Sequence, residues 1–368
     1  MAKRIGIDCR LAGTKHTGIG RYILALVPEL VKQAPADYFW VLYFADKKQK
    51  ELLIQALPAS KRKQVKFRLI PIRHYSLKEQ LSLAGIFNQD QLHLLHVPHF
   101  NKPWLYQKKT IITIHDLLWH KQRGRHVTTL NPLTYYFKYL LYRLVVNQAV
   151  ASAKAIIVPS LTTKKDLLHY YPKAKAKTYL TYEGVLLPTK MAKPKKILPK
   201  SYLLYVGSLY PHKNIDILLK ALSQTPGQTL VIVSARNIFW QRTQNLMKQL
   251  KLTARVIFFD WVSDAELKYL YVHAKALVQP SIHEGFGLTG IEALSLGTPV
   301  IASDIKVFHE VYQDAANFFS PQDVKSLTKL IQTPRQQLQK PSASQLLERY
   351  SWQKCAKETL KIYDQVLS

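Results

Sequence analysis

Residues 276–304 read ALVQPSIHEGFGLTGIEALSLGTPVIASD. The apolar run at 276–280 is typical of a buried strand, HEGFG is its exit loop, a helix is expected from Thr289, and PVIAS at 299–303 is the next buried strand. A strand, a helix and a second buried strand in this order indicate a parallel sheet covered by helices on both faces. The same alternation continues in both directions, so the sequence predicts an α/β fold.

The alternation is interrupted once, at 184–200 (GVLLPTKMAKPKKILPK), where proline and lysine replace the apolar periodicity. This texture predicts a linker over 186–200. We therefore expect two doubly wound α/β domains in series, at 1–185 and 201–349, with a final helix at 350–368 that packs back on the first domain. The expected strands have the sequences RIGID, FWVLYFA, VKFRLI, LHLLHVP, TIITIH, AIIVPS, KTYLTY, YLLYVGS, TLVIVSA, RVIFF, ALVQP and PVIAS.

The charge of the chain is strongly unbalanced, with 53 Lys+Arg against 23 Asp+Glu in 368 residues, a formal net charge of +30. Such a chain is expected to meet a nucleic acid, an acidic membrane surface or phosphorylated substrates, and the alternative is a solvated cationic surface. The two cysteines, Cys9 and Cys355, lack metal-ligand spacing, which favours a reducing cytoplasm. No signal peptide or spanning helix is recognisable, so any membrane contact would be peripheral.

Candidate ligand-binding residues follow the strand ends, because ligands of open parallel sheets bind beyond the carboxyl ends of the strands. Gly18 and Gly20 precede an expected helix, where backbone N–H groups can approach a phosphate. Their G-x-G pattern lacks a third glycine, and the alternative is a loop tuned for a tight turn. His115 follows TIITI and can place an imidazole in a cleft, although a structural role is also open. For His96 and His99 the structural role is favoured.

Lys213 follows the strand YLLYVG and lies beside an expected helix N-terminus. Pro211 gives a rigid turn there, and Asn214 is expected to cap the next helix. An ammonium beside free backbone N–H groups is unfavourable unless an anion joins them. Lys213 is therefore predicted to contact a diphosphate, and the alternative is a solvated lysine.

Two glutamates eight residues apart, Glu284 and Glu292, enclose the glycine-rich loop. Gly285 and Gly287 allow close backbone approach to a ligand, and the helix N-terminus beyond them favours an anion. Carboxylates are good partners for vicinal hydroxyls, so the pair can address the two ends of an elongated ligand with a central phosphate. Thr289 to Glu292 also has the spacing of a capping box, and the alternative is that Glu292 only caps the helix and Glu284 is an ordinary loop acid.

The stretch HEGFGLTGIEALSLGTPVIASD resembles the E-x7-E signature of retaining glycosyltransferase family 4, in its mannosyltransferase-like branch. The blocks GIDCRLAG…TGIGRY, TIHDL, VGSLYPHKN, WVSDAELKYLY and YSWQKCAKETLKIYDQVL fit in order, so the resemblance spans nearly the whole chain. It implies the GT-B fold, in which two Rossmann-like doubly wound domains face each other across a cleft. The first domain would bind the acceptor and the second the nucleotide sugar, with the C-terminal helix crossing back.

The resemblance also implies roles for the candidate residues. Glu284 would face the donor sugar and Glu292 the nucleotide ribose, while the backbone around Phe286, Gly287 and Leu288 would hold the diphosphate or the sugar. Lys213 matches the phosphate-binding lysine, His115 a histidine near C6 of the sugar, and Gly18 and Gly20 the loop that faces the donor diphosphate or the acceptor. The sequence departs from the family pattern at Ser208, His212, Ser234 and Asp260, which leaves the base specificity open.

The implied reaction is hexosyl transfer with retention, from a nucleotide-diphosphate sugar (GDP-mannose or a UDP-sugar) to a hydroxyl of a glycan or lipid-diphosphate-linked acceptor. The product would be a cell-surface polysaccharide or glycolipid. No metal is expected, since the sequence has no Asp-x-Asp motif. A sugar-nucleotide epimerase or a phosphorylase on the same fold is the alternative, and a nucleic-acid-binding protein is a remote one, because no reader motif is present.

The stretch PLTYYFKYLLYRL at 132–144 interleaves aromatic side chains with Lys138 and Arg143, as helices at a membrane interface do. It predicts a cytoplasmic protein with peripheral contact to the anionic inner face of a membrane. The alternative is that these aromatic side chains form the core of the first domain.

Overall fold

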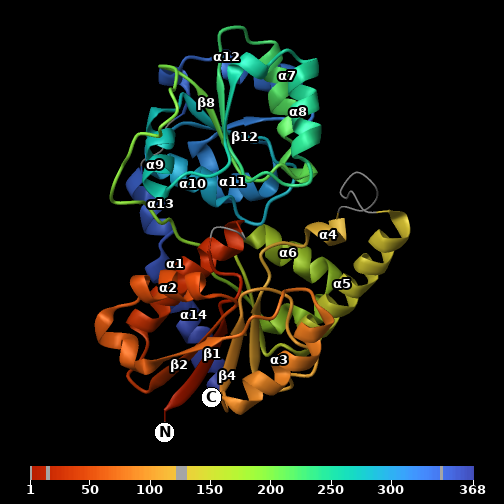
Figure 1. Cartoon of the computed structure of the whole chain (residues 1–368), viewed down its shortest axis with the longest axis vertical. Coiled ribbons are helices and arrows are strands. Elements are labelled where there is room, and N and C mark those ends of the chain that lie inside the picture. Colours follow the sequence, from red (N-terminus) through yellow and green to blue (C-terminus); the bar gives the residue numbers. More distant parts are fainter. Residues whose placement is uncertain (1, 14–16, 122–130, 340–342) are drawn as a thin grey trace. The chain divides into compact units, whose positions relative to one another are not determined.

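The computed structural model describes residues 2–13, 17–121, 131–339 and 343–368 (Figure 1). The chain forms two compact units. Unit 1 contains the described residues up to Trp119, residues 131–184 and residues 350–368, and unit 2 contains the rest. Apart from His120 and Lys121, the end of α4 (Leu118–Lys121), which fall in unit 2, the described chain passes from unit 1 to unit 2 after Gly184 and returns after Arg349.

Unit 1 is built on a seven-stranded parallel sheet with the order β3-β2-β1-β4-β5-β6-β7. Its inner strands are buried along most of their length, because helices cover both faces of a parallel sheet, whereas the two edge strands are only partly buried. The strands are β1 (Lys3–Asp8), β2 (Tyr38–Phe44), β3 (Val65–Leu69), β4 (Leu94–Val97), β5 (Thr110–Thr113), β6 (Ala155–Val158) and β7 (Thr178–Leu180). The helices are α1 (Thr17–Gln33), α2 (Lys47–Ala56), α3 (Leu77–Gln89), α4 (Leu118–Lys121), α5 (Pro132–Ser152), α6 (Leu161–Tyr170) and α14 (Trp352–Leu367).

Unit 2 is built on a six-stranded parallel sheet with the order β10-β9-β8-β11-β12-β13. Its strands are β8 (Leu203–Val206), β9 (Leu230–Val233), β10 (Val256–Phe259), β11 (Ala276–Gln279), β12 (Val300–Ser303) and β13 (Asn317–Phe319). Its helices are α7 (Ile215–Ser223), α8 (Trp240–Gln249), α9 (Asp264–His273), α10 (Leu288–Ser295), α11 (Lys306–Tyr312), α12 (Val324–Gln332) and α13 (Ala343–Arg349).

The predicted fold class, two doubly wound α/β domains, is confirmed. Every run expected to be a strand forms one, and all strand pairs are parallel. Among the strands of the described residues, β13 alone was not expected: it is three residues long, lies at the sheet edge and pairs with β12 alone. Its sequence, NFF, is too short to show a strand period.

Each sheet contains one point where the strand order reverses. In unit 1 the reversal lies between β1 and β4, and in unit 2 between β8 and β11. The members of each pair are hydrogen-bonded in parallel, so their carboxyl ends meet at one edge of the sheet. In doubly wound folds such a switch point is where ligands bind.

Helix α14 belongs to unit 1 and packs against α1. Its Tyr363 hydroxyl lies 2.6 Å from Nδ1 of His96 in β4, and the Thr113 hydroxyl lies 2.8 Å from Nε2 of the same ring. Burial, reinforced by the nearby His115, lowers the pKa of His96 to about 3. His96 is therefore a neutral packing residue that links the last helix to the centre of the sheet, the structural role that its sequence context favoured.

Among the described residues, no helix combines the length and the hydropathy that a bilayer crossing requires. Both cysteines, Cys9 and Cys355, are free thiols in the interior. Cys9 follows β1, and Cys355 lies in α14.

Acid should destabilise unit 1 through His96. The unfolded chain gains a proton on this side chain below its usual pKa of 6.5, whereas the folded protein stays neutral down to about pH 3. His96 thus lowers the free energy of unfolding by up to about 1.4 kcal/mol for each pH unit below its usual pKa. In His96→Asn this contribution is absent. The difference in the free energy of unfolding between the wild type and the variant should therefore become smaller as the pH falls from 7 to 4.

Urea denaturation at several pH values measures this difference, with the exposed His169→Asn as the control. Parallel pH profiles for the wild type and His96→Asn would contradict the interpretation of His96 as a neutral buried group.

Candidate functional site

The switch point of unit 2 carries an ion pair between the two residues on which the sequence analysis placed most weight. Lys213 ends the turn Pro211–Lys213 after β8, and Glu284 lies in the loop after β11. Lys213 Nζ donates to Glu284 Oε1 over 2.5 Å, and the Ser281 hydroxyl donates to the same oxygen over 2.9 Å. Parallel pairing of β8 with β11 brings together residues that are 71 positions apart.

The charges of this pair are set by burial and by each other. Burial would raise the pKa of Glu284, but the Lys213 ammonium beside it outweighs burial, so the pKa is lowered. For His212, burial and the charge of Lys213 together lower the pKa to about 4. At neutral pH the site therefore holds a carboxylate and an ammonium, while the imidazole of His212 is uncharged.

The Lys213 ammonium has an anionic partner within the protein, the Glu284 carboxylate. Its contact with a diphosphate stays a prediction. The prediction that Asn214 caps α7 through its side chain is wrong: its Nδ2 donates to the Pro321 carbonyl over 2.9 Å. Asn214 instead turns the backbone, with φ of 53°, in the left-handed region that asparagine tolerates better than most residues.

The N-terminus of α10 is shaped by glycines that pack beneath Tyr312. Gly287 precedes the helix with φ of 106°, and a Cβ there would lie 2.3 Å from the Tyr312 hydroxyl oxygen. That hydroxyl lies within hydrogen-bond distance of two acceptors, the Gly287 carbonyl oxygen at 2.8 Å and Gln279 Oε1 at 2.6 Å, and its single proton can be donated to either. A Cβ on Gly290 would also meet these two side chains, at 2.3 Å from each. Gly287 and Gly290 are therefore required by packing and backbone conformation at this point.

The predicted capping box at the start of α10 is wrong. The helix begins at Leu288, directly after Gly287, so Thr289 already lies inside it. The Thr289 hydroxyl accepts from Gln279 Nε2 over 2.7 Å, and Glu292 accepts from the Tyr271 hydroxyl over 2.9 Å. Glu292 is thus buried and held by α9, rather than folded back over the helix N-terminus.

The loop residues 285–287 lie between Glu284 and α10. Phe286 and Gly287 are buried, whereas Gly285 before them and Leu288, the first residue of the helix, are partly exposed. The three loop residues thus connect the carboxylate of the ion pair to the first turn of the helix, whose backbone N–H groups have no partners within the helix.

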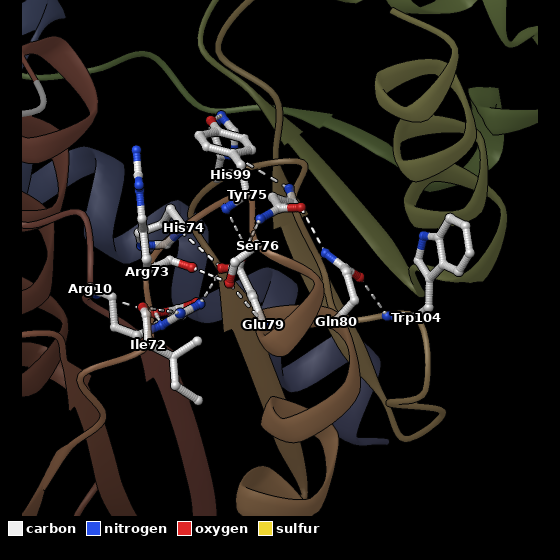
Figure 2. A network of polar contacts seen from close by, with 12 residues as sticks. Arg10, Ile72, Arg73, His74, Tyr75, Ser76, Glu79, Gln80, His99 and Trp104 are labelled. Atoms are coloured by element: carbon white, nitrogen blue, oxygen red, sulfur yellow. Dashed lines mark hydrogen bonds and ion pairs between the residues drawn. The ribbon is translucent and has the colours of Figure 1, made fainter. Parts of the chain in front are cut away.

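The switch point of unit 1 carries a buried ionic network that the sequence analysis missed. Asp8 ends β1, and Arg10 two residues later is fully buried. Figure 2 shows the Arg10 guanidinium reaching Glu79 of α3, 2.8 Å away, and its Nη2 also contacts Asp8 Oδ2 at 2.6 Å. Burial would raise the pKa of Asp8, but the charge and the hydrogen bonds of Arg10, together with the nearby His74, outweigh burial and lower the pKa.

Glu79 uses both of its carboxylate oxygens to fix the neighbouring loops (Figure 2). Oε2 accepts from the Tyr75 backbone N–H and from Asn101 Nδ2, each over 2.6 Å. Oε1 lies 3.0 Å from Nδ1 of His74. The Tyr75 backbone has φ of 59°, an uncommon conformation for an aromatic residue, and the bond to Glu79 holds it there. The loops after β3 and β4 are therefore tied to the end of β1.

The network forms one wall of a small cavity at this edge of the sheet. The residues that line it are Asp8, Leu11, Ile23, His74, Val97, Pro98, His99 and Asn101. Within the described part of the chain, no group of three or more His, Cys, Asp or Glu side chains is arranged to hold a metal ion. A sequence signal did exist, since charged residues at 8 and 10 follow a buried strand directly, but their partner Glu79 is too distant along the chain to be inferred.

His115 lies in unit 1, two residues after β5. Its Nδ1 is 3.1 Å from Glu183 Oε1, its Nε2 is 3.2 Å from the Pro98 carbonyl oxygen, and the Tyr22 ring packs edge-on at 4.7 Å. Carboxylate and carbonyl oxygens both accept hydrogen bonds, so the ring is oriented by two acceptors. His115 is not in the same unit as Lys213 and Glu284.

The prediction that Gly18 and Gly20 lie in a loop before a helix is wrong. Helix α1 begins at Thr17, so Gly18 and Gly20 belong to its first turn. A Cβ at Gly20 would lie 1.9 Å from the Gly13 carbonyl oxygen, so glycine at 20 allows the chain after β1 to pack closely on the helix. Gly18 has open space around the position of a Cβ.

Two family models together match most of the chain. The model described as Glycosyltransferase Family 4 matches residues 16–187, and the model described as Glycosyl transferases group 1 matches residues 188–336. The O-antigen chain mannosyltransferase RfbU of Salmonella typhimurium is 32% identical over 73% of this chain and 72% of its own length.

The chain belongs to glycosyltransferase family 4.

The O-antigen chain mannosyltransferase B of Escherichia coli is 26% identical to this glycosyltransferase over 94% of the chain and 96% of its own length. Among solved structures, sucrose-phosphate synthase from Thermosynechococcus elongatus superposes with a TM-score of 0.75 at 19% identity, covering 99% of both chains. WaaG, a glycosyltransferase of lipopolysaccharide biosynthesis, superposes with a TM-score of 0.65 at 13% identity, covering 99% of this chain and 98% of its own. These likenesses show the GT-B fold that the sequence resemblance implied.

The ion pair at the switch point of unit 2 can be tested apart from any activity. In Lys213→Met the Glu284 carboxylate keeps its burial and loses its cation, so its pKa should rise above the usual 4.5. The wild-type pair stabilises the fold above about pH 4.5, and this contribution is lost as the pH falls through the lowered pKa of Glu284. The variant should therefore be destabilised at pH 7 by on the order of 2 kcal/mol, and less so at pH 4.

Urea denaturation of a double-mutant cycle checks this interpretation, with Glu284→Gln and the double variant as its other corners. Lys213→Met should change how the free energy of unfolding depends on pH, because the Glu284 carboxylate loses its cation. The double variant has no carboxylate at position 284, so this change should be absent from it. A destabilisation of Lys213→Met that is the same at pH 4 and pH 7 would show that the carboxylate does not depend on this lysine.

Proposed function

We propose that this glycosyltransferase transfers a hexose, with mannose as the first candidate, from a nucleotide-diphosphate sugar to a hydroxyl with retention at the anomeric carbon. The observation that carries the proposal is the Lys213–Glu284 ion pair at the switch point of unit 2, directly before α10. The named mannosyltransferase relatives support mannose, and GDP-mannose or a UDP-sugar is the proposed donor.

Departure of the nucleoside diphosphate is the demanding step, because negative charge develops on its terminal phosphate as the anomeric C–O bond breaks. Lys213 and the backbone N–H groups at the start of α10 would stabilise that charge. The acceptor oxygen would attack from the same face, and its proton would pass to the departing phosphate oxygen. A bound diphosphate would compete with Glu284 for the ammonium and release the carboxylate to accept hydrogen bonds from sugar hydroxyls.

The other candidate residues take their roles from the same arrangement. Glu292 would bind the ribose, and its contact with Tyr271 holds the carboxylate in place for that. The backbone of residues 285–288 would hold the diphosphate or the sugar. His115, oriented by Glu183, would lie near C6 of the sugar once the donor is bound.

The acceptor is proposed to bind in unit 1, at the cavity beside the Asp8–Arg10–Glu79 network. Half of its lining residues are polar, and of these His74, His99 and Asn101 offer hydrogen-bonding groups for the hydroxyls of a glycan at its mouth. The first turn of α1, with Gly18 and Gly20, follows the same strand, β1. A glycan carried on a lipid diphosphate at the inner face of a membrane fits the relatives named for O-antigen chains and the formal charge of +30.

Glu284→Ala and Lys213→Ala should each lower the transfer rate by about two orders of magnitude or more while leaving the protein folded, because each removes a group that acts on the donor. Lys220→Ala, an exposed lysine of α7 in the same unit, is the matched control and should retain the wild-type rate. Near wild-type rates for both site variants, with purified donor and acceptor, would refute the site.

The same assay separates the alternatives. A transferase releases nucleoside diphosphate only when an acceptor is present, whereas an epimerase releases none and a phosphorylase requires free phosphate. NMR of the product should show the anomeric configuration of the donor, and an inverted product would exclude the retaining mechanism.

Transfer should not require a divalent metal, because the ammonium of Lys213 and the α10 amides are proposed to meet the charge of the diphosphate. The rate should be unchanged within error when EDTA is added in excess over all divalent ions. A loss of rate that Mg²⁺ or Mn²⁺ restores would show that a metal takes part of this role.

A further inference from the structure

Helix α5 exposes a row of large apolar side chains, which we call the α5 stripe. Leu133 is 86% exposed, Phe137 63% and Leu140 57%. The stripe comprises Leu133, Tyr136, Phe137, Leu140, Leu141 and Leu144. The central positions 133, 137, 140 and 144 recur at the spacing of a single helix face, so the row is continuous along three turns.

The opposite face of α5 is also apolar: Val146, Ala149 and Val150 pack in the core of unit 1, and Tyr135 nearer the N-terminus of the helix is buried as well. A helix that is hydrophobic on all sides is ordinarily buried on all sides. Here only one side is covered, and Figure 1 shows the N-terminal end of α5 projecting from the strands of unit 1. The aromatic residues of 132–144 are therefore divided: Tyr135 joins the core, whereas Tyr136 and Phe137 face outward.

The charge around the stripe has one sign. Helix α5 has no acidic residue and carries Lys138, which is exposed, and Arg143. The whole span of positions 117–165 contains neither aspartate nor glutamate. On α6, the next helix along the chain, Lys165 is exposed as well. Because the charged residues of α5 itself are both cations, its exposed apolar face is complementary to a lipid surface with anionic headgroups above an apolar interior.

A second feature of the same region is an exposed tryptophan. Trp119 of α4 is 45% exposed, and its ring lies 5.4 Å from that of Tyr142, which packs on the core of unit 1 from the covered face of α5. Tryptophan and tyrosine are enriched where hydrocarbon meets lipid headgroups, because each ring has an apolar body and a polar group.

We propose that the α5 stripe inserts into the surface of an anionic lipid bilayer and docks unit 1 on it, with Lys138 and Arg143 at the level of the headgroups. The helix lies on the membrane and does not cross it, since its other face is bound to the sheet. A second copy of the chain fits less well as the occupant, because two surfaces free of acidic residues repel each other. The purpose of this docking rests on the proposed function: the enzyme would meet its lipid-linked acceptor at the membrane surface.

Co-sedimentation with vesicles tests the docking surface without any need for transfer. The wild type should bind vesicles of phosphatidylcholine with phosphatidylglycerol, and bind phosphatidylcholine alone much more weakly. The double variant Phe137→Glu/Leu140→Glu should weaken binding to the anionic vesicles by about tenfold or more, since it places two carboxylates in the row. The matched control, Ile197→Glu/Ile238→Glu, changes two exposed apolar residues of unit 2 and should bind as the wild type does.

Equal binding of the wild type to both kinds of vesicle, or equal loss of binding in both double variants, would overturn the proposal. Sedimentation equilibrium identifies the competing occupant: a wild-type oligomer that Phe137→Glu/Leu140→Glu dissociates, without any effect on vesicle binding, would assign the stripe to a second copy. Circular dichroism of each variant verifies the fold.

Transfer to a soluble acceptor distinguishes this inference from the proposed function. Phe137→Glu/Leu140→Glu should retain the wild-type rate on a soluble glycan and lose rate only on a vesicle-bound acceptor. If the wild type binds anionic vesicles through α5 but transfers no sugar, the proposed function fails and the docking surface stands. If the wild type transfers sugar to a soluble acceptor but its binding to vesicles does not depend on α5, the docking surface fails and the proposed function stands.

Discussion

The candidate site depends on one constraint, the parallel pairing of two strands at the point where the strand order of the sheet reverses. From these two strands the chain continues toward opposite edges of the sheet. Because β8 and β11 are hydrogen-bonded in parallel, the loops that follow them emerge at one edge, and Lys213 can reach Glu284 across 71 positions of sequence. The pairing of β1 with β4 does the same in unit 1, where Asp8 and Asn101 line one cavity. Each unit thus gathers its polar groups at the point where its strand order reverses.

Both switch points hold charges that are compensated from within the protein. Arg10 is enclosed by Asp8 and Glu79, and Lys213 by Glu284. The two arrangements differ in exposure: the Arg10 and Glu79 side chains are fully buried, while Lys213 and Glu284 remain 23% and 14% exposed. A buried pair is costly to open, whereas a partly exposed pair can exchange partners. The first suits a fixed scaffold and the second a site that receives an anion.

Sequence periodicity was sufficient for the sheets but not for the local details of the site. Runs such as AIIV and LVIV are buried on both faces, which is why they are continuous, and only the three-residue edge strand β13 carried too little pattern. Lys213 and Glu284 could be named because each follows a strand end. The start of α10 was misjudged because Tyr312, which lies later in the chain, fixes Gly287; likewise Arg10 finds Glu79 only in three dimensions.

The return of α14 to unit 1 has a consequence for biosynthesis. Domains generally fold in order as the ribosome makes them, but here the first half of the chain lacks the helix that covers α1 and supplies Tyr363 to His96. Unit 2 can complete its own core earlier. The N-terminal half of a nascent chain would therefore stay without this helix, with α1 uncovered on that side, until α14 has left the ribosome.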